Sequence, residues 1–293
     1  MKADNVQSKR EILTALIELM LIKSTPVCAL TAALGVATTG ILDPKSITMV
    51  ALIFGTLMGG FFSLDSVKDI EADKINKPDR PIPSGRLSIK QAESFVVILF
   101  SLSVLFIITL YASTSSLQTL LLAFLGLVLA ISYTLPPTLS RIPLLSNAIL
   151  ASLFTIFPLL TGWTLFKPLN QAPFFIIGAL FFLAWGDIED FEDVEGDEFV
   201  GIKTLPILIG IKKAAVVFSL IVSLSLIIGV YAFLTDFKSY WLISLPQQFT
   251  MGFLILQLIK TQEKNDIFRI HYLCQILSIS TGLTLLIGYI LLG

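Results

Sequence analysis

Long apolar runs separated by short polar stretches dominate this sequence. Each run is continuous over about 20 residues, which is the length that a helix needs to cross a bilayer. None alternates between apolar and polar positions as a transmembrane barrel strand would, so the pattern predicts an all-α integral membrane protein. We expect about nine transmembrane helices, at residues 24–42, 46–64, 91–112, 117–136, 143–164, 171–187, 214–234, 240–259 and 271–292, after a short amphipathic helix at 11–23.

The composition narrows the class of protein further. Hydrophobic residues make up 55% of the 293-residue chain and charged residues 14%, against roughly 25% charged residues in a soluble domain. The mean hydropathy is +0.87. Because such a chain has too little polar surface to cover a globule in water, the composition excludes a soluble enzyme, a disordered protein and a nucleic-acid binder. We therefore expect membrane lipids around the protein and no nucleic acid as a partner.

The basic residues are distributed unevenly between the two sides that nine spans would define. Seventeen of the 20 Lys and Arg residues fall on the side of the N-terminus, and Lys45, Lys167 and Lys238 fall on the other. Short loops rich in Lys and Arg stay in the cytoplasm. We therefore expect a multi-pass protein of the cell membrane with a cytoplasmic N-terminus and an outside C-terminus. Both long polar loops, about 65–90 and 187–213, then form a cytoplasmic polar cap.

Acidic residues gather at the start of each long loop. Asp65, Asp69 and Asp73 are spaced i, i+4, i+8, so a helix would carry all three carboxylates on one face. The second loop holds seven acidic residues between positions 187 and 197. Like charges on one face repel, and acids near a helix C-terminus oppose the macrodipole. Each array therefore costs stability unless a cation lies among the carboxylates.

The second array has the same one-face geometry, because Asp190, Asp193 and Asp197 are spaced i, i+3, i+7. Two such arrays on one side of the membrane predict a shared site for hard divalent cations. Mg²⁺ usually takes one or two carboxylates, several waters and a substrate phosphate. The two loops thus predict a place where a diphosphate binds through Mg²⁺.

Basic residues are interleaved with the acidic ones. Lys77, Arg80 and Arg86 lie in a proline-rich turn whose backbone is stiff, and Lys203 follows the second array. Arg suits bidentate phosphate contacts and Lys acts as a point charge. These four residues are candidates for binding the diphosphate, although part of this positive charge also serves as a topology signal.

Two segments resemble a known family. Residues 69–86 (DIEADKINKPDRPIPSGR) resemble the first signature of the UbiA superfamily of intramembrane prenyltransferases, and residues 190–197 (DFEDVEGD), with TLP at 204–206, resemble the second. The resemblance implies one transmembrane prenyltransferase domain over residues 1–293, with its helices bundled around a central cavity. It also implies that Mg²⁺ joins both motifs to a prenyl diphosphate, whose departing diphosphate leaves an allylic carbocation for an acceptor to attack.

The resemblance assigns roles residue by residue. The metal ligands would be Asp65, Asp69, Asp73, Asp190, Asp193 and Asp197. The catalytic residues would be Asp69, Asp193 and Tyr133. The substrate-binding residues would be Lys23, Lys77, Arg80, Arg86, Arg141, Asn147 and Lys203. Ser66 stands where the family usually has an acid, and we expect Asp65 to take over that role; Tyr133 could alternatively anchor the membrane interface, where we also expect His271.

The motifs leave the acceptor open. They are similar to those of family members that make archaeal ether lipids, which favours geranylgeranyl diphosphate as donor and geranylgeranylglyceryl phosphate as lipophilic acceptor. An aromatic or tetrapyrrole acceptor of the quinone or chlorophyll type is the alternative, as is a membrane terpene cyclase without a second substrate. A transporter or Mg²⁺ channel would be a different class, and it would be expected to carry ionisable residues at mid-membrane depth, which most spans here lack.

Overall fold

The computed structural model describes residues 9–20, 24–236, 238–261 and 263–292. All regular structure within these residues is helical. The helices of the bundle are α2 (Thr25–Ala37), α3 (Pro44–Lys68), α5 (Ile89–Thr114), α6 (Leu117–Thr134), α9 (Phe174–Ala184), α13 (Ile211–Asp236), α14 (Ser239–Gln257) and α15 (Lys264–Leu292), with the pair α7 (Leu145–Phe154) and α8 (Ile156–Trp163). The remaining helices are α1 (Lys9–Leu19), α4 (Ile70–Asn76), α10 (Glu189–Glu192), α11 (Val194–Val200), α12 (Leu205–Ile209), η1 (Leu139–Arg141) and η2 (Leu169–Gln171).

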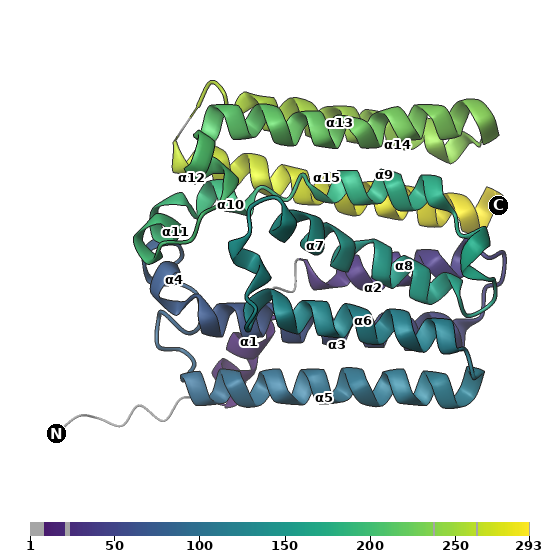
Figure 1. Cartoon of the computed structure of the whole chain (residues 1–293), viewed down its shortest axis with the longest axis horizontal. Helices are drawn as coiled ribbons and strands as arrows, with labels where there is room; N and C mark the ends of the chain where they lie inside the picture. The colour runs from purple at the N-terminus through teal and green to yellow at the C-terminus, as the bar shows by residue number, and fades with distance from the viewer. Residues whose placement is uncertain (1–8, 21–23, 237, 262, 293) are drawn as a thin grey trace.

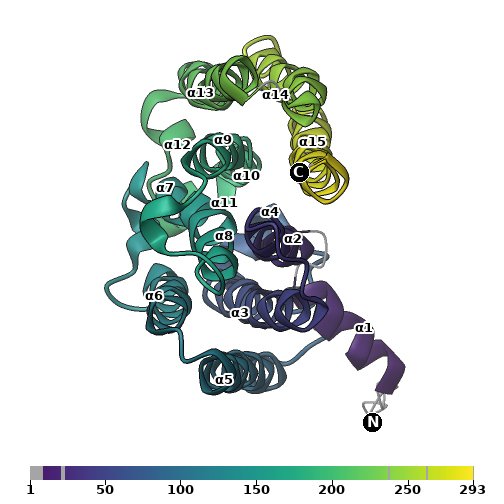
Figure 2. The same ribbon diagram turned by 90° about the vertical axis from the view of Figure 1, so that its right-hand side faces the viewer.

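The long helices lie side by side and roughly parallel in one bundle (Figure 1). Seen end-on, they follow a curved path from α5 through α3, α8 and α9 to α13, α14 and α15 (Figure 2). The helix α15 returns to pack against α2, far from it in the sequence. The short helices α4, α10, α11 and α12 gather at one end of the bundle, and α15 finishes at the other end (Figure 1).

In the part of the chain that the structure describes, six helical stretches are long and apolar enough to cross a membrane: α3, α5, α6, α13, α15 and the broken stretch Leu145–Trp163. Two further helices are shorter, since α2 has 13 residues and α9 has 11. At about 1.5 Å per residue they reach roughly 20 Å and 17 Å, against a hydrocarbon core of about 30 Å. The all-helical, multi-pass membrane architecture is confirmed, while the count of nine spans stays a prediction.

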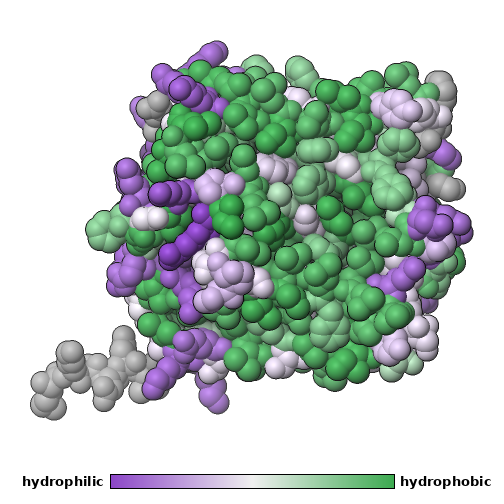
Figure 3. Space-filling model, viewed as in Figure 1, coloured by the Kyte–Doolittle hydropathy of each residue, from purple (hydrophilic) through white to green (hydrophobic). Residues whose placement is uncertain are grey.

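The surface agrees with a membrane setting. Figure 3 shows a wide apolar face over the long helices, with polar side chains gathered at the end that carries the short helices and in smaller number at the opposite end. The cysteines, Cys28 and Cys274, are buried and free.

Glycines allow α2 and α8 to approach closely. A Cβ atom at Gly35 would overlap the backbone of Leu159, and one at Gly162 would overlap the backbone of Ala32. The two helices pack closely together, and α2 also lines the apolar pocket described below. Larger residues at either glycine would push the two helices apart.

Candidate functional site

The six aspartates predicted as metal ligands all line one cavity at the end of the bundle where the short helices lie. They come from the end of α3, from α4 and from the α10–α11 region: Asp65, Asp69, Asp73, Asp190, Asp193 and Asp197. We call this space the acidic cavity. The two arrays, predicted to share one site, thus lie at the same cavity.

The middle aspartate of each array stands at a junction between two helices. Asp69 lies between α3 and α4, and Asp193 lies between α10 and α11. The backbone nevertheless keeps the i+4 spacing, since Asp73 N donates to the carbonyl of Asp69 at 2.7 Å and Asp197 N donates to that of Asp193 at 2.9 Å. Each array therefore keeps its carboxylates on one side, facing the cavity.

Asn76 fastens the two arrays together. Its side-chain Nδ2 donates to the carbonyl of Asp193 at 2.9 Å, and its Oδ1 accepts from the backbone N–H of Gly196 at 2.9 Å. Glycine is required at position 196, because a Cβ there would overlap the Asn76 side chain and the backbone of Ala72. The sequence pattern gave no sign of this contact, because its partners are about 120 residues apart.

Two cations link the loops through charged contacts. Arg80 binds both oxygens of Asp73 through Nη1, at 2.9 and 3.0 Å, and Glu189 through Nη2 at 2.9 Å. Lys77 Nζ lies 2.7 Å from Asp193 Oδ2 and also contacts Glu189. Glu189, which the sequence reading did not single out, is thus the shared partner of both cations. Burial alone would raise the pKa of Glu189, but Lys77 and Arg80 bring it well below its usual range.

The negative charges of the aspartates in the cavity are less fully balanced by neighbouring cations than that of Glu189. Burial, with the neighbouring Asp73 and Asp197, raises the pKa of Asp69 to about 7. Burial also raises the pKa of Asp193 to about 7, although Lys77 opposes the shift. Protons therefore bind the free site near neutral pH, and a divalent cation would compete for the same oxygens.

The residues fit a cation that brings further ligands with it. Within the described part of the chain, no group of three carboxylate, imidazole or thiol side chains is arranged to hold a metal ion by itself. Mg²⁺ commonly uses one or two carboxylates and completes its shell with water and phosphate. A buried oxygen of Asp193, Oδ1, has no hydrogen-bond partner. These observations fit a metal site in which water and a substrate phosphate complete the coordination shell. They fit less well a site in which protein side chains supply every ligand.

Three further predicted features lie at the cavity wall. Tyr133 lines it and packs edge-to-face against Phe61, with ring centroids 5.3 Å apart. Asn147 also lines it and donates to Asp190 Oδ2 at 3.2 Å. Asp65 accepts from the hydroxyl of Thr134 at 3.2 Å. Ser66 is buried outside the lining, so Asp65 is the residue of that pair that faces the cavity.

Other predicted substrate-binding residues lie elsewhere. Arg86 binds Glu18 at 2.6 Å and the carbonyl of Asp79 at 2.6 Å, because the proline-rich turn carries it back toward α1. Arg141 is exposed and lines a neighbouring depression together with Asp65. Lys203 is exposed and outside the cavity lining. Lys23 lies outside the described residues.

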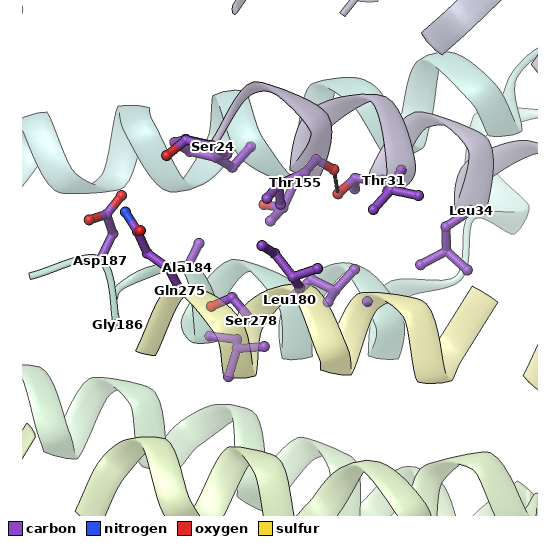
Figure 4. A pocket seen from close by; sticks show the side chains of 16 residues that line it. Ser24, Thr31, Leu34, Thr155, Leu180, Ala184, Gly186, Asp187, Gln275 and Ser278 are labelled. Carbon is purple, nitrogen blue, oxygen red and sulfur yellow. Dashed lines mark hydrogen bonds between the residues drawn. The ribbon is translucent and has the colours of Figure 1, made fainter. Parts of the chain in front are cut away.

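A second, apolar pocket opens beside the acidic cavity (Figure 4). Its walls come from α2, α7, α9 and α15 and are mostly aliphatic. Phe154, Ala184 and Asp187 line both spaces, so the two are contiguous. We call it the apolar pocket. A ligand with an anionic head and a long apolar chain matches this pair of spaces.

His271, which was expected at the membrane interface, is enclosed by acidic side chains of the protein. The side chain is buried, with Nδ1 2.8 Å from Glu192 Oε1 and Nε2 2.7 Å from Asp187 Oδ1. Both acids belong to the second acidic loop. The sequence showed that this loop is rich in acidic residues. It did not show that a histidine about 80 residues away contacts two of them.

The model of the UbiA prenyltransferase family matches residues 26–280. The chain belongs to this family. The predicted family and enzyme class, a membrane prenyltransferase, are thereby confirmed.

Individual proteins with similar sequences carry the name of one enzyme. A digeranylgeranylglyceryl phosphate synthase from Saccharolobus solfataricus is 30% identical over 251 residues, which cover 84% of this chain and 86% of the relative. The synthase of the same name from Methanosarcina mazei is 34% identical over 170 residues, covering 57% of this chain and only 56% of the relative.

Solved structures share the fold. A structure described as that of digeranylgeranylglyceryl phosphate synthase in membranes has a TM-score of 0.67 at 22% identity, covering 96% of this chain and 99% of that one. A UbiA homologue from Archaeoglobus fulgidus bound to GPP and Mg²⁺ has a TM-score of 0.67 at 18% identity, covering 93% and 99%. At these identities the likeness concerns the fold.

Proposed function

We propose that this protein transfers a geranylgeranyl group from geranylgeranyl diphosphate to the hydroxyl of geranylgeranylglyceryl phosphate, in archaeal ether-lipid synthesis, with Mg²⁺ as cofactor. The observation that carries the proposal is the contiguity of the acidic cavity with the apolar pocket through Phe154, Ala184 and Asp187. The synthase-named relatives and the homologue bound to GPP and Mg²⁺ support the same choice of substrate and metal.

Different residues would bind the metal ion, stabilise the leaving diphosphate and shield the prenyl chain from water. The two aspartate arrays would hold Mg²⁺, which when bound stabilises charge on the leaving diphosphate. Lys77 and Arg80, fixed beside the arrays by Glu189, add positive charge for the same oxygens. The apolar pocket shields the prenyl chain from water, which would otherwise capture the carbocation.

Aromatic side chains form part of the wall of the acidic cavity, and Phe154 also lines the apolar pocket. Phe61, Phe62, Tyr133 and Phe154 line the acidic cavity. Their π faces attract a cation without reacting as hydroxide or water would. They therefore suit the place where an allylic carbocation forms.

The membrane arrangement follows from the charge distribution. We infer nine spans in a single domain, with the acidic cavity on the cytoplasmic side and the C-terminus outside. The 17-to-3 split of basic residues supports this orientation.

The test of the proposed function is an assay of the purified full-length protein with labelled geranylgeranyl diphosphate. The acceptors tested are geranylgeranylglyceryl phosphate, an aromatic quinone precursor and a tetrapyrrole carboxylic acid. A further reaction contains no acceptor. Mass spectrometry should find the diether phosphate as the main product, formed only with a divalent cation. Preferred prenylation of a ring acceptor, or a cyclised product without acceptor, would replace the proposal with one of those activities.

A further inference from the structure

Asp187 stands where the apolar pocket meets the acidic cavity, and it lines both. Among the described residues that line the apolar pocket, it alone is an acid or a base. Figure 4 shows its carboxyl group at one end of the pocket beside the amide of Gln275, with Leu34 and Leu180 farther along. A single carboxylate thus faces the boundary at which a prenyl chain would join its diphosphate.

His271 fixes the orientation of this carboxylate. Its Nε2 lies 2.7 Å from Asp187 Oδ1, and its Nδ1 lies 2.8 Å from Glu192 Oε1. Each ring nitrogen therefore lies at hydrogen-bond distance from a carboxylate oxygen. Held at both nitrogens and only 7% exposed, the imidazole cannot turn without breaking a buried contact. Gln275 lies one helical turn farther along α15, with its amide 3.0 Å from Nε2.

The second oxygen of Asp187 remains available. No hydrogen bond within the described part of the chain reaches Oδ2, and the side chain is 34% exposed. Asp187 also precedes the first aspartate of the second array by three residues, and its Oδ1 is already engaged by His271. A carboxylate here repels a diphosphate, whereas it accepts a hydrogen bond from a neutral hydroxyl.

We propose that Asp187 binds the hydroxyl of an alcohol acceptor and accepts its proton, and that His271 is a positioning residue for Asp187. This rests on the proposed function, because it takes prenyl transfer to an alcohol as the reaction. The bond between C1 of the prenyl group and the diphosphate oxygen breaks, and its electron pair leaves with the diphosphate. A lone pair of the acceptor oxygen forms the new C–O bond to C1, and the hydroxyl proton passes to Asp187 Oδ2. Loss of that proton to water restores the carboxylate.

A thiol acceptor distinguishes a role of Asp187 in accepting a proton from a role in maintaining the structure of the site. The thiol of cysteine has a pKa near 8.5, and thiols are far more acidic than alcohols, so an analogue with a thiol in place of the reacting hydroxyl loses its proton with little help. The experiment uses the purified full-length protein, Mg²⁺, labelled geranylgeranyl diphosphate and either the glycerol ether phosphate or its thiol analogue. The variants are Asp187→Asn, which keeps the shape, His271→Gln, and Cys274→Ala as a buried control on the same helix.

We expect Asp187→Asn to lower kcat with the alcohol at least about 100-fold, within the range of general-base catalysis. With the thiol, the loss should be less than about fivefold, and the KM for geranylgeranyl diphosphate should stay unchanged. His271→Gln should show the same selectivity with a loss of about tenfold, and Cys274→Ala should retain the kcat of the unsubstituted protein with both acceptors.

Each result has a defined consequence. Wild-type protein that prenylates neither acceptor would contradict the proposed function itself. Active wild-type protein together with an undiminished Asp187→Asn variant would overturn this inference alone, and so would an equal loss with both acceptors. If Asp187→Asn does not accumulate as folded protein, the selectivity of His271→Gln decides: an alcohol-specific loss supports the inference, and an equal or absent loss overturns it.

Discussion

At the scale of single residues, the charge balance of the acidic cavity determines its chemistry. Lys77 and Arg80 are drawn mainly to Glu189 and to one aspartate of each array. The remaining carboxylate charge raises proton affinity, and burial with the neighbouring Asp193 raises the pKa of Asp197 to about 8. The free site is therefore prepared for a cation, and protons are the competing ligand.

Metal affinity should consequently depend on pH. The raised pKa values of Asp69, Asp193 and Asp197 mean that protons occupy the free site below about pH 7 and leave it as pH rises to 8. We expect the Mg²⁺ affinity to increase between pH 6 and 8, by about tenfold per pH unit for each proton displaced. Calorimetry in buffers of different ionisation enthalpy should detect proton release on binding. A pH-independent affinity without proton release would show that these carboxylates are not the ligands.

At the scale of secondary-structure elements, Asn76 sets the relation between α4 and α11. Its two hydrogen bonds are the direct side-chain link from the end of α4 to the backbone of the second array. Asn76→Ala should lower the free energy of unfolding by about 1–3 kcal/mol. It should also weaken Mg²⁺ binding about 10- to 100-fold, as loss of outer contacts does at other metal sites. Denaturation and Mg²⁺ titration measure both effects.

The control for this change is Asn170→Ala, because Asn170 is exposed on η2 outside both cavities. It should leave stability and Mg²⁺ affinity unchanged. Equal behaviour of the two variants would mean that Asn76 does not hold the arrays in register.

The close approach of α2 and α8 is a second prediction at this scale. Gly162→Ala places a methyl group against the backbone of Ala32, so the helices must separate. We expect a loss of about 1–3 kcal/mol in stability, seen as a lower Tm in detergent. Gly55→Ala is the matched control, since a Cβ at Gly55 meets nothing within 4 Å and alanine favours the helix. An unchanged Tm for Gly162→Ala would contradict the packing.

The sequence predicted the aspartate arrays well because each array follows a local helical period. Asp65, Asp69 and Asp73 keep that period even across the junction between α3 and α4. The contacts of Glu189, Asn76 and His271 could not be predicted in this way, because their partners lie about 80 to 120 residues away. The contact of Arg86 with Glu18 could not be predicted for a related reason, since only the path of the turn decides that the two residues meet.

At the scale of the whole molecule, apolar runs predicted the helical membrane architecture but not every helix length. The runs at 24–42 and 171–187 became the short helices α2 and α9 because turns and extended residues take up their ends. The stretch at 143–164 became two helices that meet at Thr155. Hydropathy records apolar content, whereas packing decides where a helix breaks.

Orientation can be tested by cysteine labelling, because both native cysteines are buried. Ser84 is exposed in the proline-rich turn, and Asn170 is exposed on η2 in the loop before α9. In intact cells, an impermeant maleimide should label Asn170→Cys and spare Ser84→Cys until the membrane is opened. The reverse pattern would contradict both the positive-inside argument and a cytoplasmic acidic cavity.

The central claim is that both aspartate arrays together hold a divalent cation and the prenyl diphosphate. Its most direct test is the binding of a non-reactive thiolodiphosphate analogue of geranylgeranyl diphosphate to Asp69→Asn, Asp193→Asn and the exposed control Glu71→Gln, with Mg²⁺ or with EDTA. The account predicts that wild-type protein and Glu71→Gln bind only with Mg²⁺, and that either aspartate change weakens binding by about 100-fold or more, because a single array leaves the metal incompletely held. Equal binding in EDTA, or tight binding by either aspartate variant, would contradict it.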